Sequence, residues 1–180
     1  MKKLLLVIGL LGVLGFGLSS CLGNEVEDKY KDWRKTNNEW FEQQQANTTY
    51  YKTVTAPWDP NGQVLIHWYN DTMLTRDNLK PLLTSGVEVK YRGTLYDGTP
   101  FDSSYLSTSP RDSIAQFTVN SVIDGWSLGV MQMHVGDSCR MVIPYSMGYG
   151  TSSRGSVIIP YSTLVFDIKL DNIYAYEVKP

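Results

Sequence analysis

Two segments in the second half of the chain alternate apolar and polar residues, a pattern typical of a β-strand with one buried face. In the first, Val87, Val89, Tyr91 and Leu95 alternate with polar side chains. Residues 163–170 repeat the pattern with leucine, phenylalanine and isoleucine on one side. An Asp-Gly-Thr turn at residues 97–99 follows the first segment, and its glycine can adopt positive φ at no steric cost. The pattern therefore predicts a half-buried antiparallel sheet.

A single short helix is expected beside these strands. Ile123, Trp126 and Val130 recur at spacings of three and four, which places them on one helical face. Residues 64–69 form a further dense β-type run, bounded by turn residues on both sides. One helix among several antiparallel strands indicates an α+β fold in which the helix covers the sheet.

Composition narrows the possible functions. The chain has 42% apolar and 19% charged residues, which is typical of a globular protein. A formal net charge of −2 and a pI near 5.6 argue against a nucleic-acid partner, because such a partner requires a basic face. The two histidines and two cysteines form no zinc-binding pattern, so no metal is expected.

Residues 1–20 are interpreted as an export signal. Lys2 and Lys3 precede an uncharged apolar run over residues 4–18, which is shorter than the roughly 20 residues of a membrane-spanning helix. Residues 18–21, Leu-Ser-Ser-Cys, resemble the bacterial lipobox. This resemblance implies a lipid on Cys21 that anchors the chain to the cell envelope, at the outer membrane, with its domain in the periplasm or at the cell surface. The alternative is an ordinary secretory signal with a chance cysteine at the junction.

The rest of the chain is divided into a polar linker at residues 21–49 and a domain at residues 50–180. Within the linker, residues 24–46 carry apolar side chains at helical spacing, Trp33 and Trp40 among them. This helix either packs on the domain or serves as a spacer or self-association element. Cys139 has no partner once Cys21 carries lipid, and it is expected to be a buried, inert side chain rather than a reactive thiol.

The order of several motifs resembles the FKBP family of peptidyl-prolyl cis/trans isomerases. Residues 89–95 read V-K-Y-R-G-T-L, residues 97–104 D-G-T-P-F-D-S-S and residues 122–126 V-I-D-G-W. Residues 143–144 and 149–150 read I-P and Y-G, residues 158–160 I-I-P and residues 163–170 T-L-V-F-D-I-K-L. The resemblance spans residues 86–171. It implies a bent antiparallel sheet of five or six strands wrapped around one short helix.

The resemblance also implies a proline-binding pocket and a role for each matching residue. Asp102, Tyr91 and Tyr149 match catalytic positions, with the Tyr149 hydroxyl and the Ile123 backbone N–H holding peptide carbonyls. The substrate-binding positions are Phe101, Phe117, Val122, Ile123, Trp126, Ile158, Ile159 and Phe166. The implied activity is isomerisation of Xaa–Pro bonds in exported proteins, without a cofactor. Proline-containing peptides, unfolded exported proteins and macrolides are the expected ligands.

Two segments at the rim of this pocket depart from the family pattern. Residues 115–121 are shorter than usual and carry Ala115 where many members have an aromatic residue, although Phe117 lies close enough to compensate. Residues 160–163 are one residue short. These departures support one alternative to an isomerase, a chaperone that binds proline peptides without turnover. A further alternative is an adaptor lipoprotein that interacts through its 24–46 helix.

Overall fold

The computed structural model describes residues 29–106 and 113–177. The expected signal segment 1–20 and the lipid-attachment residue Cys21 lie outside the described residues. The elements, in chain order, are α2 (Lys31–Ala46), β1 (Lys52–Ala56), β2 (Asp59–Trp68), β3 (Gly86–Leu95), β4 (Pro100–Ser103), β5 (Ala115–Thr118), α3 (Asp124–Val130), β6 (Ser138–Ile143) and β7 (Leu164–Ala175), with short 3₁₀ turns η1 (Thr72–Leu74), η2 (Ser104–Leu106), η3 (Val119–Ser121) and η4 (Tyr145–Met147).

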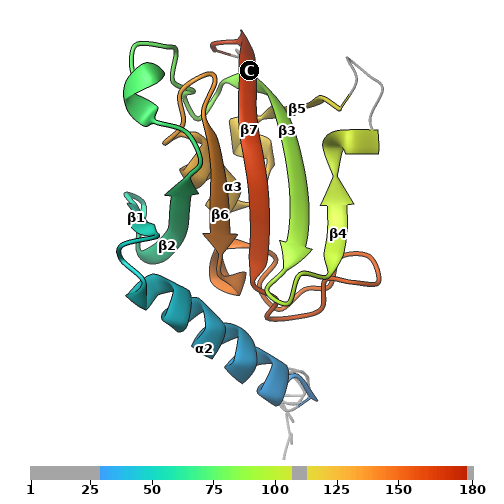
Figure 1. Ribbon diagram of the computed structural model, residues 1–180. Coiled ribbons are helices and arrows are strands. Elements are labelled where there is room, and N and C mark those ends of the chain that lie inside the picture. The colour runs from blue at the N-terminus through green and yellow to red at the C-terminus, as the bar shows by residue number, and fades with distance from the viewer. Residues whose placement is uncertain (1–28, 107–112, 178–180) are drawn as a thin grey trace, which may run out of the picture.

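The strands form one antiparallel sheet in the order β1-β2-β6-β7-β3-β4, with β5 paired to β3 (Figure 1). The α+β class is confirmed, but the described residues contain seven strands where five or six were expected. The difference arises at the edges of the sheet. One edge strand is β1, and β4 and β5 are two short strands that pair with different halves of β3.

The core lies between the sheet and α3, which Figure 1 shows behind the strands. The alternating residues predicted to point inward, Val87, Val89, Tyr91 and Leu95, are all buried. They pack with Trp126, Leu128 and Val130 of α3 and with the inward face of β7. The period-2 pattern therefore identified the buried face of both long strands. Glu88, on the opposite side of β3, is also buried, because β7 and β5 flank β3 on both sides there.

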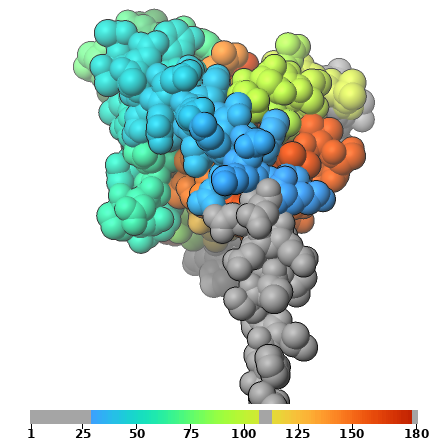
Figure 2. Space-filling model, turned by 90° about the horizontal axis from the view of Figure 1, so that it is seen from below, coloured from blue at the N-terminus to red at the C-terminus, as the bar shows by residue number. Residues whose placement is uncertain are grey.

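The N-terminal helix α2 packs across one end of this sheet (Figure 2). The Trp33 ring lies 5.3 Å from Tyr96 in the β3–β4 turn, and its indole N–H donates to the Ser162 hydroxyl at 3.3 Å. Phe41 is buried with Leu65, Val142 and Val165 on the outer face of the sheet. Of the two interpretations of the 24–46 segment, the structure shows the packed helix, from Lys31 onward.

Cys139 is fully buried on β6, as predicted. Its burial, with the nearby carboxylates of Asp137 and Asp167, raises the pKa of the thiol to about 12. No helix in residues 29–106 or 113–177 has the length and apolar character needed to cross a membrane.

Candidate active site

A cavity of about 640 Å³ opens between α3 and the strands β3, β4, β5 and β7. Its lining combines side chains from these elements with a loop that follows η4. The lining residues are Tyr91, Asp102, Phe117, Ser121, Val122, Ile123, Trp126, Gly148, Tyr149, Ser152, Arg154 and Phe166. The sequence segments that contribute are far apart, so the cavity exists only in the folded chain.

Trp126 forms the floor of the cavity. Its ring lies 5.4 Å from Tyr91, 5.6 Å from Phe117 and 5.5 Å from Phe166, each in an edge-to-face arrangement. Such contacts are favourable because the positive edge of one ring meets the negative face of another. These three aromatic neighbours fix the orientation of Trp126 and exclude water beneath it, and the residue is only 4% exposed.

Gly125 allows α3 to approach the sheet closely enough to place Trp126. A Cβ atom at Gly125 would lie 2.4 Å from Cγ2 of Ile143, which is fully buried on β6. The extended backbone of Ile123 precedes the first turn of α3 and brings Val122 and Ile123 to the cavity wall. The short helix is therefore positioned by backbone contact as well as by side-chain packing.

Asp102 supplies a carboxylate at one edge of the aromatic floor. The Tyr91 hydroxyl donates to Oδ2 at 2.8 Å, and the Ser103 backbone N–H donates to Oδ1 at 2.8 Å. Burial raises the pKa of Tyr91 above its ordinary value, and the hydrogen bond to Asp102 and the charge of Asp102 raise it further. Tyr91 is therefore a protonated donor at neutral pH, and it holds the carboxylate in place from the core side.

Tyr149 and Arg154 form another part of the cavity rim. The Arg154 guanidinium carbon lies 5.2 Å from the centre of the Tyr149 ring, within cation–π range. Backbone hydrogen bonds between Arg154 and Ile158, of 2.8 and 3.3 Å, close the loop that carries this rim. The rim thus adds a phenol and a cation to a cavity whose floor is aromatic.

The structure brings together most of the residues predicted for the site. Tyr91, Asp102, Phe117, Val122, Ile123, Trp126, Tyr149 and Phe166 all line the cavity. Phe117 packs on both Tyr91 and Trp126, so it fills the side that the short 115–121 segment leaves without a bulky residue at Ala115.

Three predicted residues do not line the cavity. Phe101 supports the wall from behind, with its ring 5.4 Å from Phe166. Ile158 was expected at the loop edge but is 5% exposed and belongs to the core, because its bridge to Arg154 turns the loop inward at that point. Ile159, the alternative for the same role, is also absent from the lining residues.

Four lining residues were not predicted: Ser121, Gly148, Ser152 and Arg154. Ser121 directly precedes the predicted Val122, so sequence proximity was a usable signal for it. The other three lie in or beside a polar loop whose path over the cavity depends on the Arg154–Ile158 bridge. The sequence of residues 148–154 carries no periodicity that would indicate this path.

The comparison with protein families matches residues 79–171 to the model described as FKBP-type peptidyl-prolyl cis-trans isomerase. This match covers more than half of the chain and includes all twelve residues that line the cavity. The chain belongs to the FKBP family. The aromatic cavity of this FKBP domain is formed largely by residues of the sequence motifs quoted above.

Individual relatives agree with this assignment. The FKBP-type 22 kDa peptidyl-prolyl cis-trans isomerase of Escherichia coli is 43% identical over 90 residues, which are 50% of this chain and 42% of that protein. The macrophage infectivity potentiator of Trypanosoma cruzi is 42% identical over 93 residues, 52% of this chain and 45% of that protein. The chain thus spans less than half the length of these curated relatives, and the match is confined to the FKBP domain.

Solved structures match over a longer part of the chain. A peptidyl-prolyl cis-trans isomerase from Pseudomonas syringae superposes with a TM-score of 0.64 at 29% identity, covering 80% of this chain and 95% of that one. FkpA from Escherichia coli gives a TM-score of 0.67 at 27% identity, with 86% and 65% covered. The FKBP fold of this chain is therefore confirmed by structure as well as by sequence.

Proposed function

We propose that this chain is a peptidyl-prolyl cis/trans isomerase that acts on Xaa–Pro bonds of exported proteins. The observation that carries the proposal is the aromatic cavity floored by Trp126, with the Asp102 carboxylate at its edge. The floor has the shape and polarity to receive a proline ring, and the polar groups lie at its rim.

The chemistry needs neither a nucleophile nor a cofactor. Amide resonance imposes a barrier of about 18–20 kcal/mol on rotation about the peptide bond. A catalyst lowers this barrier by binding the twisted amide more tightly than either planar form. A twisted amide has lost resonance, so its carbonyl is less polar and its nitrogen gains a lone pair. An apolar cavity favours that species over the planar amide, which water solvates well.

Within this mechanism each group of side chains has a distinct role. Trp126, Phe117 and Phe166 hold the proline ring and exclude water. The Tyr149 hydroxyl and the Ile123 backbone N–H bind carbonyls of the peptide. The Asp102 carboxylate lies beside the twisting amide and is held there by Tyr91. Phe101 acts indirectly, through its contact with Phe166.

The proposal is tested by the rate of cis/trans exchange in the peptide Ala-Leu-Pro-Phe, measured by NMR with the full chain in mild detergent. We expect clear acceleration, reduced about tenfold or more in Asp102→Val and in Tyr149→Phe, because each removes a group that stabilises the transition state. Asp77→Val and Tyr105→Phe are matched controls: both side chains are exposed and lie outside the cavity, and neither change should affect the rate.

A folded chain that binds the peptide without accelerating exchange would contradict the isomerase proposal and support a non-catalytic chaperone. A folded chain that neither binds nor accelerates would support an adaptor role. Circular dichroism of each variant confirms that loss of activity does not reflect loss of structure.

We further propose that Cys21 carries a lipid and that the chain is anchored to the cell envelope. The support is the Leu-Ser-Ser-Cys sequence after an apolar run, together with a relative, 38% identical over 94 residues, that is named outer membrane protein MIP in Legionella longbeachae. Metabolic labelling of an expressing bacterium with an alkyne fatty acid should label the chain, and Cys21→Ser should remove the label. Unlabelled wild-type chain in the soluble fraction would contradict the anchor.

A further inference from the structure

The connection between β2 and β3, residues 70–85, exposes apolar side chains to solvent. Leu74 is 83% exposed, Met73 61% and Leu79 59%, and Leu82 and Leu83 are 40% and 45% exposed. Single exposed apolar residues are common, but several in one short segment indicate an interaction surface.

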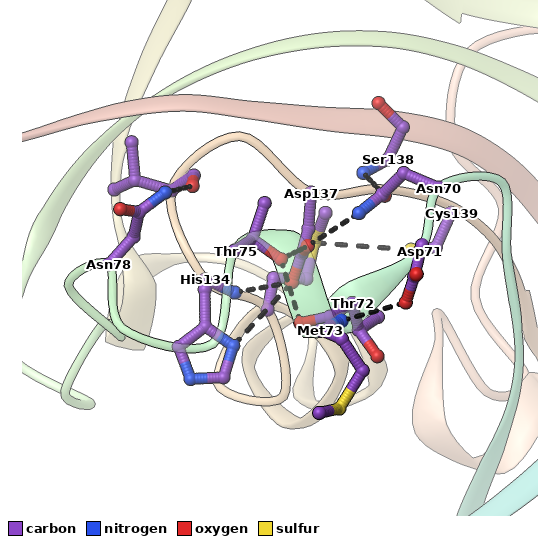
Figure 3. Close-up of polar contacts among 12 residues, drawn as sticks. Asn70, Asp71, Thr72, Met73, Thr75, Asn78, His134, Asp137, Ser138 and Cys139 are labelled. Carbon is purple, nitrogen blue, oxygen red and sulfur yellow. Dashed lines mark hydrogen bonds and ion pairs between the residues drawn. The ribbon is translucent and has the colours of Figure 1, made fainter.

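The polar residues of the same segment point inward and hold it in place. Asp137 is fully buried and accepts hydrogen bonds from Asn70 Nδ2 at 2.9 Å, from the Thr75 hydroxyl at 2.5 Å and from the His134 backbone N–H at 2.7 Å (Figure 3). Asn78 Nδ2 donates to the Val135 carbonyl at 2.8 Å. Hydrogen bonds to a buried carboxylate order the segment, so its leucines are held at the surface rather than folded into the core.

Ser85 joins the end of this segment to the C-terminal end of β7. Its hydroxyl accepts from the Leu82 backbone N–H at 2.9 Å and donates to the Tyr176 carbonyl. Tyr174 lies against Gly86, where a Cβ atom would come within 2.4 Å of its ring. Tyr174 and Tyr176 are 46% and 48% exposed. We call this surface the apolar end patch and define it as Leu79, Leu82, Leu83, Tyr174 and Tyr176.

The apolar end patch is connected to the cavity by one turn of chain. The Val119 backbone N–H donates to the Ser85 carbonyl at 2.9 Å. Val119 begins η3, and Ser121, at the other end of that turn, lines the cavity. Val119 and Ser121 are two positions apart, so their Cα atoms lie at most about 7 Å from each other. A polypeptide whose proline lies in the cavity therefore reaches the patch within a few residues.

Two features argue against a membrane as the occupant. Residues 70–85 carry Asp71 and Asp77 against Arg76 and Lys80, so their net charge is zero and they offer no attraction to anionic lipid. The segment also lies at the opposite end of the sheet from the first turn of α2 (Figure 1), which is the described element that follows Cys21 in the sequence.

We propose that the apolar end patch binds apolar residues of the same unfolded polypeptide whose proline occupies the cavity. The inference rests on the proposed function, because it assigns a second contact to the substrate of that site. A tetrapeptide is too short to use this contact fully, whereas an unfolded protein chain uses both surfaces at once.

The test compares a short and a long substrate with the full chain and with a triple variant, Leu79→Ser, Leu82→Ser and Leu83→Ser. The short substrate is Ala-Leu-Pro-Phe. The long one is ribonuclease T1 with its disulfides reduced and blocked, whose refolding is limited by proline isomerisation. We expect kcat/KM for the tetrapeptide to change less than about twofold. We expect kcat/KM for the protein to fall about tenfold, equivalent to about 1.4 kcal/mol, because the three serines bury less apolar surface against the bound polypeptide than the leucines do.

Leu106→Ser is the matched control, because Leu106 is 92% exposed and lies outside the patch. An equal effect of the triple variant on both substrates, or no larger effect on the protein than Leu106→Ser, overturns the inference. The inference is also overturned if analytical ultracentrifugation shows that the wild type forms a dimer and the triple variant does not. The patch would then be a self-association surface. Binding of wild type, but not of the triple variant, to phosphatidylethanolamine–phosphatidylglycerol vesicles would identify a membrane surface instead.

If the chain is not an isomerase, the wild type does not accelerate tetrapeptide exchange, which distinguishes this outcome from failure of the patch alone. The patch is then tested by fluorescence anisotropy with labelled, unfolded ribonuclease T1. Weaker binding by the triple variant supports the patch even without catalysis, and equal binding contradicts it.

Discussion

Tyr91 shows how a single residue serves both the core and the cavity. Its ring packs on Trp126, and its hydroxyl donates to Asp102. Tyr91→Phe keeps the ring and removes the donor. We expect kcat/KM for Ala-Leu-Pro-Phe to fall about tenfold, equivalent to about 1.4 kcal/mol of transition-state stabilisation. Because burial and Asp102 raise the pKa of Tyr91, wild-type activity should not change through Tyr91 ionisation between about pH 6 and about pH 9. Tyr105→Phe, at an exposed position outside the cavity, is the control for Tyr91→Phe.

Cys139 is a second residue whose environment decides its chemistry. With Cys21→Ser, Cys139 is the one thiol left in the chain. Its burial and raised pKa keep it protonated and inaccessible. We expect iodoacetamide at about pH 8 to label it only after the chain is unfolded in guanidinium chloride, as measured by intact mass. Rapid labelling of the native chain would contradict the described packing.

At the scale of elements, Asn37 attaches α2 to the sheet. It is fully buried; its Oδ1 accepts from the Thr163 backbone N–H at 2.7 Å, and its Nδ2 donates to the Trp33 carbonyl at 2.9 Å. Asn37→Ala leaves a buried N–H without a partner, which costs about 1–3 kcal/mol. Urea unfolding should show this loss in the free energy of unfolding, whereas the neighbouring Asn38→Ala should have a much smaller effect. Equal effects would mean that the bond to Thr163 contributes nothing.

Over the whole molecule, an ion pair on the outer face of the sheet links three strands and makes stability depend on pH. Arg140 on β6 forms two hydrogen bonds with Asp167 on β7, of 2.8 and 2.9 Å, and Tyr69, just after β2, donates to the same carboxylate. Burial alone would raise the pKa of Asp167, but the hydrogen bonds from Arg140 and Tyr69 outweigh it and lower the pKa below its usual value.

A carboxylate with a lowered pKa stabilises the folded state at pH values above its unfolded pKa of about 3.9, and this contribution is lost as pH falls through its folded pKa. Asp167→Asn should therefore be less stable than wild type at about pH 6, and the difference should shrink on acidification towards about pH 2. Urea midpoints across this range measure it. A difference that stays constant with pH would mean that the charge of Asp167 is not responsible.

The sequence alone determined the buried faces of the long strands and most of the cavity. Alternation identifies an inward face locally, because successive side chains in a strand point to opposite sides. The helical spacing of Ile123, Trp126 and Val130 likewise identified α3. The order of the motifs around these elements then indicated the FKBP family and eight residues that line the cavity. Each strand, helix or motif signal is carried by residues close together in the chain, and the family is indicated by the order of these motifs along it.

Only the tertiary structure decided the remaining features, because each depends on contacts between distant segments. Asn37 interrupts the apolar stripe of α2, yet it is buried because the Thr163 N–H, 126 positions away, needs an acceptor. Ile158 is in the core and Arg154 at the cavity rim because a backbone bridge folds their loop. The leucines of residues 70–85 remain exposed because their polar neighbours bond to the buried Asp137. Local pattern reveals which side chains prefer burial, and the fold determines which of them obtain it.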